Sequence, residues 1–101
     1  MNLSCVETND KLILTLDGSL DETAASSLPA KLSQFCSGKN QNNIVLDLSA
    51  CHIDSVLGFG ALITFRLAPC VLGREVSIQN ALPQVMGKMK LLRFEKLFKL
   101  T

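Results

Sequence analysis

The stretch from Ile44 to Ser55 reads Ile-Val-Leu-Asp-Leu-Ser-Ala-Cys-His-Ile-Asp-Ser, and it is the most informative segment for predicting the fold. Its first five residues are aliphatic or β-branched with a single polar interruption, a pattern typical of a strand that is covered on both faces. We therefore place a strand over residues 44–48 at the centre of a largely parallel sheet. Residues 49–53 are expected to connect this strand to the next element.

A long apolar segment follows over residues 56–72, and Gly73 closes it. Aspartate and serine are preferred helix N-caps and glycine is a common C-terminal stop, so the pattern predicts a helix capped by Asp54 or Ser55. The segment is apolar nearly all round, and the helix is therefore expected to be largely buried. Pro69 predicts a bend or an early end.

Outward from this centre, the chain continues to alternate between strand and helix patterns. Strands are predicted over residues 3–7, 11–17 and 75–79, and helices over residues 22–36 and 82–92. Leu12, Leu14 and Leu16 fall on one face of the second strand. Pro29 lies inside the first helix pattern, so this helix is expected either to begin near Ser26 or to bend.

Two remaining segments complete the architecture. Residues 37–43 form a polar loop, and residues 94–98 form a short apolar tail that needs a groove on the body of the protein. Strands that alternate with helices imply βαβ crossovers. The expected fold is α/β, with a small mixed, largely parallel β-sheet and α-helices packed against it, in one domain over residues 1–101.

Composition narrows the class of protein. The chain has 101 residues, of which 48% are hydrophobic and 19% charged, as in a globular domain. A net charge of +1 provides no overall field for nucleic acid or for an anionic membrane. The longest uncharged apolar run, residues 56–65, is about half of what a bilayer crossing requires. No signal segment or membrane insertion is predicted, and a cytoplasmic location is expected.

The two ends of the chain carry opposite charge. Side chains sum to about −4 over residues 1–22 and to about +4 over residues 88–99. Solvated faces of ordinary elements are one interpretation, and a basic docking surface at the C-terminal end is the other.

Cys51 and His52 lie beside Asp54 and Ser55, which raises the question of catalysis or metal binding. Sequence neighbours at a strand-to-helix connection diverge too strongly to form a catalytic triad. A zinc site would need further ligands, yet the other cysteines are not closely paired. We therefore expect no enzyme activity, no metal and free thiols at the four cysteines, Cys5, Cys36, Cys51 and Cys70.

No cofactor is expected either. Gly58 and Gly60 match neither the dinucleotide nor the Walker spacing of a phosphate-binding loop. They point in roughly opposite directions on a helix, so that one could admit the sheet and the other a partner.

Four segments resemble the STAS family, named for sulphate transporters and anti-sigma-factor antagonists. Leu16–Asp21 resembles the family's turn after its early strand, and Ile44–Ser49 resembles its Val-Leu-Asp-Leu-Ser strand. Ile53–Ser55 resembles the Asp-Ser signature that opens its central helix, and Phe94–Phe98 resembles its closing Leu-Asp-Lys-Leu-Phe. The resemblance covers nearly the whole chain in the family's order and spacing, and it implies the STAS fold.

The resemblance also implies a regulatory site. Family antagonists continue Asp-Ser-(Ser/Thr)-Gly-Leu-Gly, and a kinase-type anti-sigma factor phosphorylates the hydroxyl pair. Here Ser55 remains as a candidate phosphoacceptor, and Val56 replaces the second hydroxyl. A phosphate on Ser55 would meet free amides at the helix N-terminus, and a purely structural capping serine is the alternative.

The expected function is a protein-interaction module of the anti-sigma-factor-antagonist type, binding an anti-sigma factor or an ATPase-fold kinase. The contact residues are predicted to be Asp54, Ser55, Val56, Leu57, Gly58 and Phe59. The alternative is the cytoplasmic STAS subunit of a bacterial lipid-asymmetry ABC transporter, which binds the transporter's ATPase. A STAS domain of a sulphate permease is disfavoured because no membrane segments precede it, and a homodimer is left open.

Overall fold

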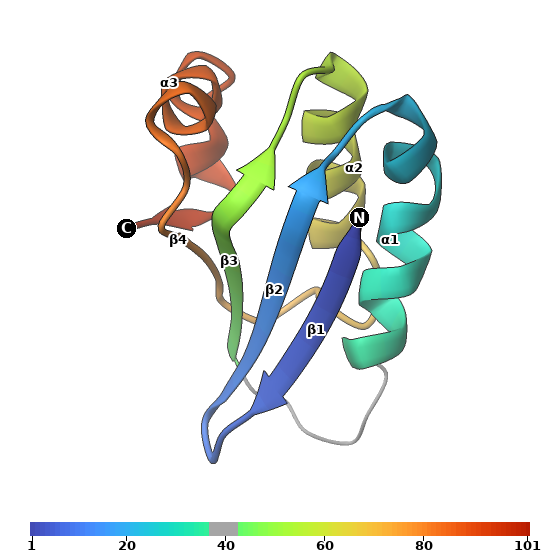
Figure 1. Ribbon diagram of the computed structural model, residues 1–101. Coiled ribbons are helices and arrows are strands. Elements are labelled where there is room, and N and C mark those ends of the chain that lie inside the picture. Colours follow the sequence, from blue (N-terminus) through green and yellow to red (C-terminus); the bar gives the residue numbers. More distant parts are fainter. Residues whose placement is uncertain (37–42) are drawn as a thin grey trace.

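The computed structural model describes residues 1–36 and 43–101 of the chain. The elements in order are β1 (Asn2–Glu7), β2 (Lys11–Ser19), α1 (Glu22–Cys36), β3 (Asn43–His52), α2 (Val56–Arg66), β4 (Val76–Gln79), α3 (Pro83–Leu91), the short 3-10 helix η1 (Phe94–Lys96) and β5 (Lys99–Leu100). Their arrangement is drawn in Figure 1. The alternation of strands and helices predicted from the sequence is confirmed.

The strands form one sheet in the order β1-β2-β3-β4-β5. Strand β1 is antiparallel to β2, and every other neighbouring pair is parallel. The sheet is therefore mixed and largely parallel, with β3 at its centre as predicted. Leu46 lies at the centre of the buried side of the sheet. It pairs with Leu14 of β2 and Ile78 of β4, and all three side chains are fully buried.

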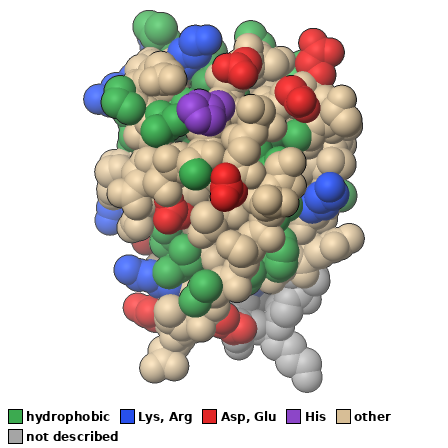
Figure 2. Space-filling model, viewed as in Figure 1, with side chains coloured by type: hydrophobic (Ala, Val, Ile, Leu, Met, Phe, Trp, Pro, Cys, Tyr) green, Lys and Arg blue, Asp and Glu red, His purple; other side chains and the backbone are tan. Residues whose placement is uncertain are grey.

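The sheet has two unlike faces. Helices α1 and α2 lie behind it in Figure 1 and cover the face that carries the buried leucines. The opposite face carries Val6, Ile13, Val45 and Ser77 in one register row. Figure 2 shows this side of the molecule as a mixture of hydrophobic, acidic and basic side chains. The hydrophobic core therefore lies between the sheet and the helices.

Helix α1 begins earlier than one of the two alternatives predicted. Asp21 Oδ1 accepts a hydrogen bond from the Ala24 amide at 2.9 Å, which caps the helix one turn before Ser26. The helix then runs through Pro29, although proline cannot donate to the Ala25 carbonyl. Burial of the helix's apolar face offsets that missing bond.

Strand β3 is longer than predicted and α2 is shorter. Residues 49–52, expected to be a connection, extend β3 because β2 continues beside it through a register shift between Thr15 and Asp17. Helix α2 ends at Arg66 instead of residue 72, because Pro69 cannot continue the helical bonding and residues 67–73 turn instead. The early end that Pro69 predicted is thus confirmed.

The C-terminal tail packs into the body of the protein, as predicted. Phe94 and Phe98 are buried and stacked, with ring centroids 5.2 Å apart, and Phe59 of α2 meets Phe94 edge-on at 5.8 Å. This packing holds Lys99 and Leu100 beside β4 as a fifth strand, which the sequence pattern did not predict.

Residues 37–42, most of the predicted polar loop, lie outside the described residues. In the two described ranges, no helix combines the length and the apolar character needed to cross a bilayer.

We predict that Leu46→Ala lowers the free energy of unfolding by about 2–5 kcal/mol, because truncation leaves a cavity at the centre of the core. Val6→Ala is the control, since Val6 is 57% exposed on the outermost strand and should cost less than about 1 kcal/mol. Urea denaturation measures both. Equal losses from the two changes would contradict the central position of β3.

Candidate protein-docking site

The connection between β3 and α2 is fixed by a serine cap. Ser55 has extended backbone angles, φ −130° and ψ 143°, and its Oγ accepts a hydrogen bond from the Leu57 amide at 3.1 Å. The Ser55 carbonyl accepts from the Gly58 amide at 3.0 Å. Of the two caps predicted for this helix, the structure therefore selects Ser55.

Two apolar side chains stand in solvent directly after this cap. Val56 is 79% exposed and Leu57 is 56% exposed, although most aliphatic side chains of the protein are buried. The first turn of α2 contains no acidic residue that could neutralise the positive end of the helix dipole, and Asp54 precedes the cap. We call residues Asp54, Ser55, Val56 and Leu57 the α2 cap surface. It combines a charge, a hydroxyl and two exposed apolar groups.

Gly58 and Phe59, which we predicted as contact residues, face the interior instead. Phe59 is 3% exposed and packs against Phe94. A Cβ atom added to Gly58 would lie 2.8 Å from Ile53 Cγ2 and 2.9 Å from the Leu20 carbonyl oxygen. These two residues therefore position the α2 cap surface and offer no side chain to a partner.

A groove that the sequence did not predict extends from the α2 cap surface along the helix layer. Glu22, Ala25, Ser26 and Pro29 of α1 line one side, and Leu57, Gly60, Ala61 and Thr64 of α2 line the other. A Cβ added to Gly60 would meet nothing within 4 Å. The two glycines therefore differ in their packing: Gly58 lies against the strand connections, and Gly60 opens to solvent.

The groove is sparsely charged. Glu22 is the one ionisable side chain among its lining residues, and α2 carries no charge before Arg66 at its end. The groove, which includes Leu57, therefore offers a largely apolar surface with one acidic side chain, Glu22.

Cys51 and His52 lie on opposite sides of β3. Cys51 is fully buried on the helix-covered face, whereas the next residue, His52, is exposed. Burial raises the pKa of the Cys51 thiol to about 11, so the reactive thiolate is scarce near neutral pH. Among residues 1–36 and 43–101 no group of three or more histidine, cysteine, aspartate or glutamate side chains is arranged to hold a metal ion.

We predict opposite effects for the two α2 glycines. Gly58→Ala should destabilise the fold by about 1–3 kcal/mol, because the backbone oxygen of Leu20 cannot yield easily to the new methyl group. Gly60→Ala should be neutral or stabilise by up to about 1 kcal/mol, since alanine favours helix and the site is open. Thermal and urea denaturation measure both. A harmless Gly58→Ala would show that α2 does not press against the strand connections.

Solved structures similar to this chain are anti-sigma factor antagonists. One from Mycobacterium paratuberculosis has a TM-score of 0.74 and 21% sequence identity, and the match covers 98% of this chain and 83% of that protein. The unphosphorylated form of SpoIIAA matches with a TM-score of 0.66 and 20% identity, covering 99% of this chain and 88% of that one. The phosphorylated form of SpoIIAA, a Bacillus cell-fate determinant, matches with a TM-score of 0.60 and 17% sequence identity. This match covers 99% of this chain and 91% of that one.

These TM-scores establish a shared fold, and a second comparison establishes the family. Residues 2–101 match the STAS domain family, which accounts for nearly every residue of the sequence. The predicted fold class is thereby confirmed, with five strands and three α-helices in the arrangement of the SpoIIAA structures. The chain belongs to the STAS domain family.

Proposed function

We propose that this protein is a non-enzymatic protein-interaction module of the anti-sigma-factor-antagonist type, which docks its partner through the α2 cap surface. The observation that carries the proposal is the exposure of Val56 and Leu57 directly after a serine-capped helix start. Fully burying one such aliphatic side chain contributes about 1.5–3 kcal/mol. Two of them beside an open apolar groove form a suitable centre for an interface.

The rigidity of the α2 cap surface supports binding. The Ser55 cap and the contact of Gly58 with Ile53 and Leu20 hold the first turn of α2 in place before any partner arrives. A preorganised surface loses less conformational freedom on binding than a loop that must be ordered first. The partner class proposed is an anti-sigma factor or a related ATPase-fold kinase.

We further propose Ser55 as a phosphoacceptor that switches this docking. A phosphate there would be stabilised by the free amides and the dipole at the start of α2. It would also bring about −1.5 to −2 charges next to Val56 and Leu57, and their burial against a partner would then require desolvating that charge. SpoIIAA, which shares this fold, has been solved in both unphosphorylated and phosphorylated forms.

A second candidate partner is the ATPase of a lipid-asymmetry ABC transporter. Val56 favours it, because the residue that replaces the second hydroxyl is 79% exposed and suits a permanent apolar contact better than a phosphorylation site. Incubation with ATP and a partner isolated by affinity capture separates the two candidates. Phosphate on Ser55 identifies the kinase-type partner, and stable binding without phosphate transfer favours the transporter ATPase.

We predict that Ser55→Asp keeps the fold but weakens partner binding about tenfold, or 1.4 kcal/mol. Aspartate is itself a good N-cap, so the melting temperature should change little, whereas its charge must be desolvated in the interface. Calorimetry with the purified partner measures the affinity. Asn9→Asp is the matched control, because it adds the same charge at the β1–β2 turn, at the opposite end of the sheet (Figure 1). Equal effects of the two changes would show that the partner docks elsewhere.

We also predict that Leu57→Ala weakens binding by about 1–2 kcal/mol, as expected for an apolar residue at the centre of an interface. Leu72→Ala provides a closely matched control, since both leucines are 56% exposed and Leu72 lies in the turn beyond the other end of α2. Its affinity should stay within about twofold of the unmodified protein. Should Leu72→Ala weaken binding as much as Leu57→Ala, the α2 cap surface is not the docking site.

A further inference from the structure

Two cysteines from distant parts of the chain lie close together in the helix layer, at the end opposite the α2 cap surface. Cys36 is the last residue of α1, and Cys70 lies in the turn that follows α2. Figure 1 shows the end of α1 and the chain after α2 at the same end of the molecule. Both thiols are free, Cys36 is 2% exposed, and Cys70 is half-buried. Neither cysteine belongs to the candidate docking site.

The sulfur of Cys70 contacts the last turn of α1. Its Sγ donates a weak hydrogen bond to the Ser33 carbonyl at 3.9 Å. Because helical carbonyls point toward the C-terminal end, the Ser33 carbonyl points toward the turn that contains Cys36. A side chain three positions on can reach such a carbonyl, as Ser26 Oγ does when it donates to the Thr23 carbonyl of the same helix at 2.7 Å. Cys36 stands in the same relation to Ser33, so both sulfur atoms are within reach of one backbone oxygen.

The electrostatics of Cys36 agree with this placement. Burial is the main cause that raises the pKa of the Cys36 thiol to about 11, and the neighbouring Cys70 is the next. Cys5 also raises this pKa, but by less, and the buried Arg74 side chain lowers it. For Cys51, in contrast, burial alone raises the pKa. Because charge interactions weaken with distance, Cys70 is the close neighbour of Cys36 among the other thiols.

We propose that Cys36 and Cys70 are a redox-sensitive modification site, and that they form a disulfide when the protein meets hydrogen peroxide. Cys70 is the more exposed thiol and reacts first. Its sulfur bonds to one peroxide oxygen, the O–O bond breaks, and the leaving hydroxide takes the thiol proton, which gives a sulfenic acid and water. The Cys36 sulfur then attacks the Cys70 sulfur, the S–O bond breaks, and the hydroxide leaves as water with the Cys36 proton. Together the two sulfur atoms lose two electrons, which reduce the peroxide.

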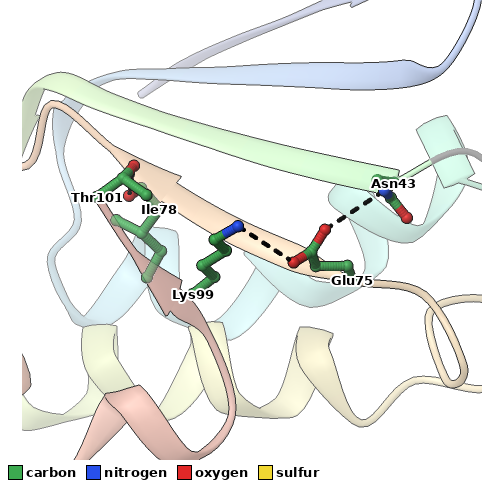
Figure 3. Close-up of polar contacts among 5 residues, drawn as sticks. All are labelled: Asn43, Glu75, Ile78, Lys99 and Thr101. Atoms are coloured by element: carbon green, nitrogen blue, oxygen red, sulfur yellow. Dashed lines mark hydrogen bonds and ion pairs between the residues drawn. The ribbon is translucent and has the colours of Figure 1, made fainter.

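The backbone that carries Cys70 is held in place in the reduced protein. The next residue, Val71, is fully buried. Farther along the same segment, Glu75 accepts a hydrogen bond from Asn43 of β3 at 3.4 Å and approaches Lys99 of β5 at 3.7 Å (Figure 3). The turn is therefore anchored to the sheet, while the other cysteine is anchored by α1. Two thiols presented by ordered backbone suit the strict geometry of a disulfide.

The disulfide is expected to stabilise the fold. It would close the segment from Cys36 to Cys70, about a third of the chain, and so reduce the conformational freedom of the unfolded protein. It would also join α1 to the chain that leaves α2, at the end of the helix layer away from Val56 and Leu57. Oxidation therefore leaves the α2 cap surface exposed and fixes the helices beneath it.

Peptide mass mapping of the unmodified chain tests the pairing without any variant. The protein is treated with hydrogen peroxide, and the remaining thiols are alkylated in denaturant before digestion. The expected product has lost two hydrogen atoms and carries Cys36 linked to Cys70 within one chain. A link from Cys36 to Cys5, a link between two chains, or oxygen added to Cys70 with no link overturns the proposal.

Thermal denaturation before and after oxidation tests the effect on the fold. The melting temperature should rise by at least about 5 °C with peroxide and return to its first value with dithiothreitol. Cys70→Ser should lose both the link and this rise. Cys5→Ser is the matched control, because Cys5 is the other half-buried thiol, and it should keep both. A rise that persists in Cys70→Ser, or a link that is lost in Cys5→Ser, shows that Cys70 is not the partner of Cys36.

Discussion

The approach of α2 to the strand connections is the constraint on which the candidate site depends. Gly58 brings the helix backbone against the Leu20 carbonyl and the Ile53 side chain, at distances that no larger residue could accept unchanged. Because glycine permits this close approach, the first turn of α2 lies against the strand connections, and Ser55 reaches the Leu57 amide. Val56 and Leu57 are then turned to solvent, since the opposite side of the turn is occupied by Gly58 and Phe59. One missing methyl group thus sets both the cap and the exposed surface.

The strands and the cap could be predicted because each depends on local pattern. Leucines in alternation at residues 12, 14 and 16 specify one buried face whatever the neighbours are, and serine is a preferred residue at a helix N-cap. Strand β5 could not be predicted, because two residues carry no periodicity. Its position follows from Phe94 and Phe98 packing against Phe59, a contact between segments far apart in the chain. The groove beside Gly60 likewise requires α1 and α2 to be placed together.

The six predicted contact residues do not share one surface, and the reason is geometric. A continuous run from Asp54 to Phe59 was assigned to one surface, but each helical residue rotates the side-chain direction by about 100°, so six consecutive positions cannot share a face. Hydrophobicity alone could not separate buried from exposed positions, because Val56 and Phe59 are both apolar. In the structure Phe59 packs against Phe94, whereas Val56 is exposed. Glycine at residue 58 was the available signal, because a glycine inside an apolar helix indicates close packing on that side.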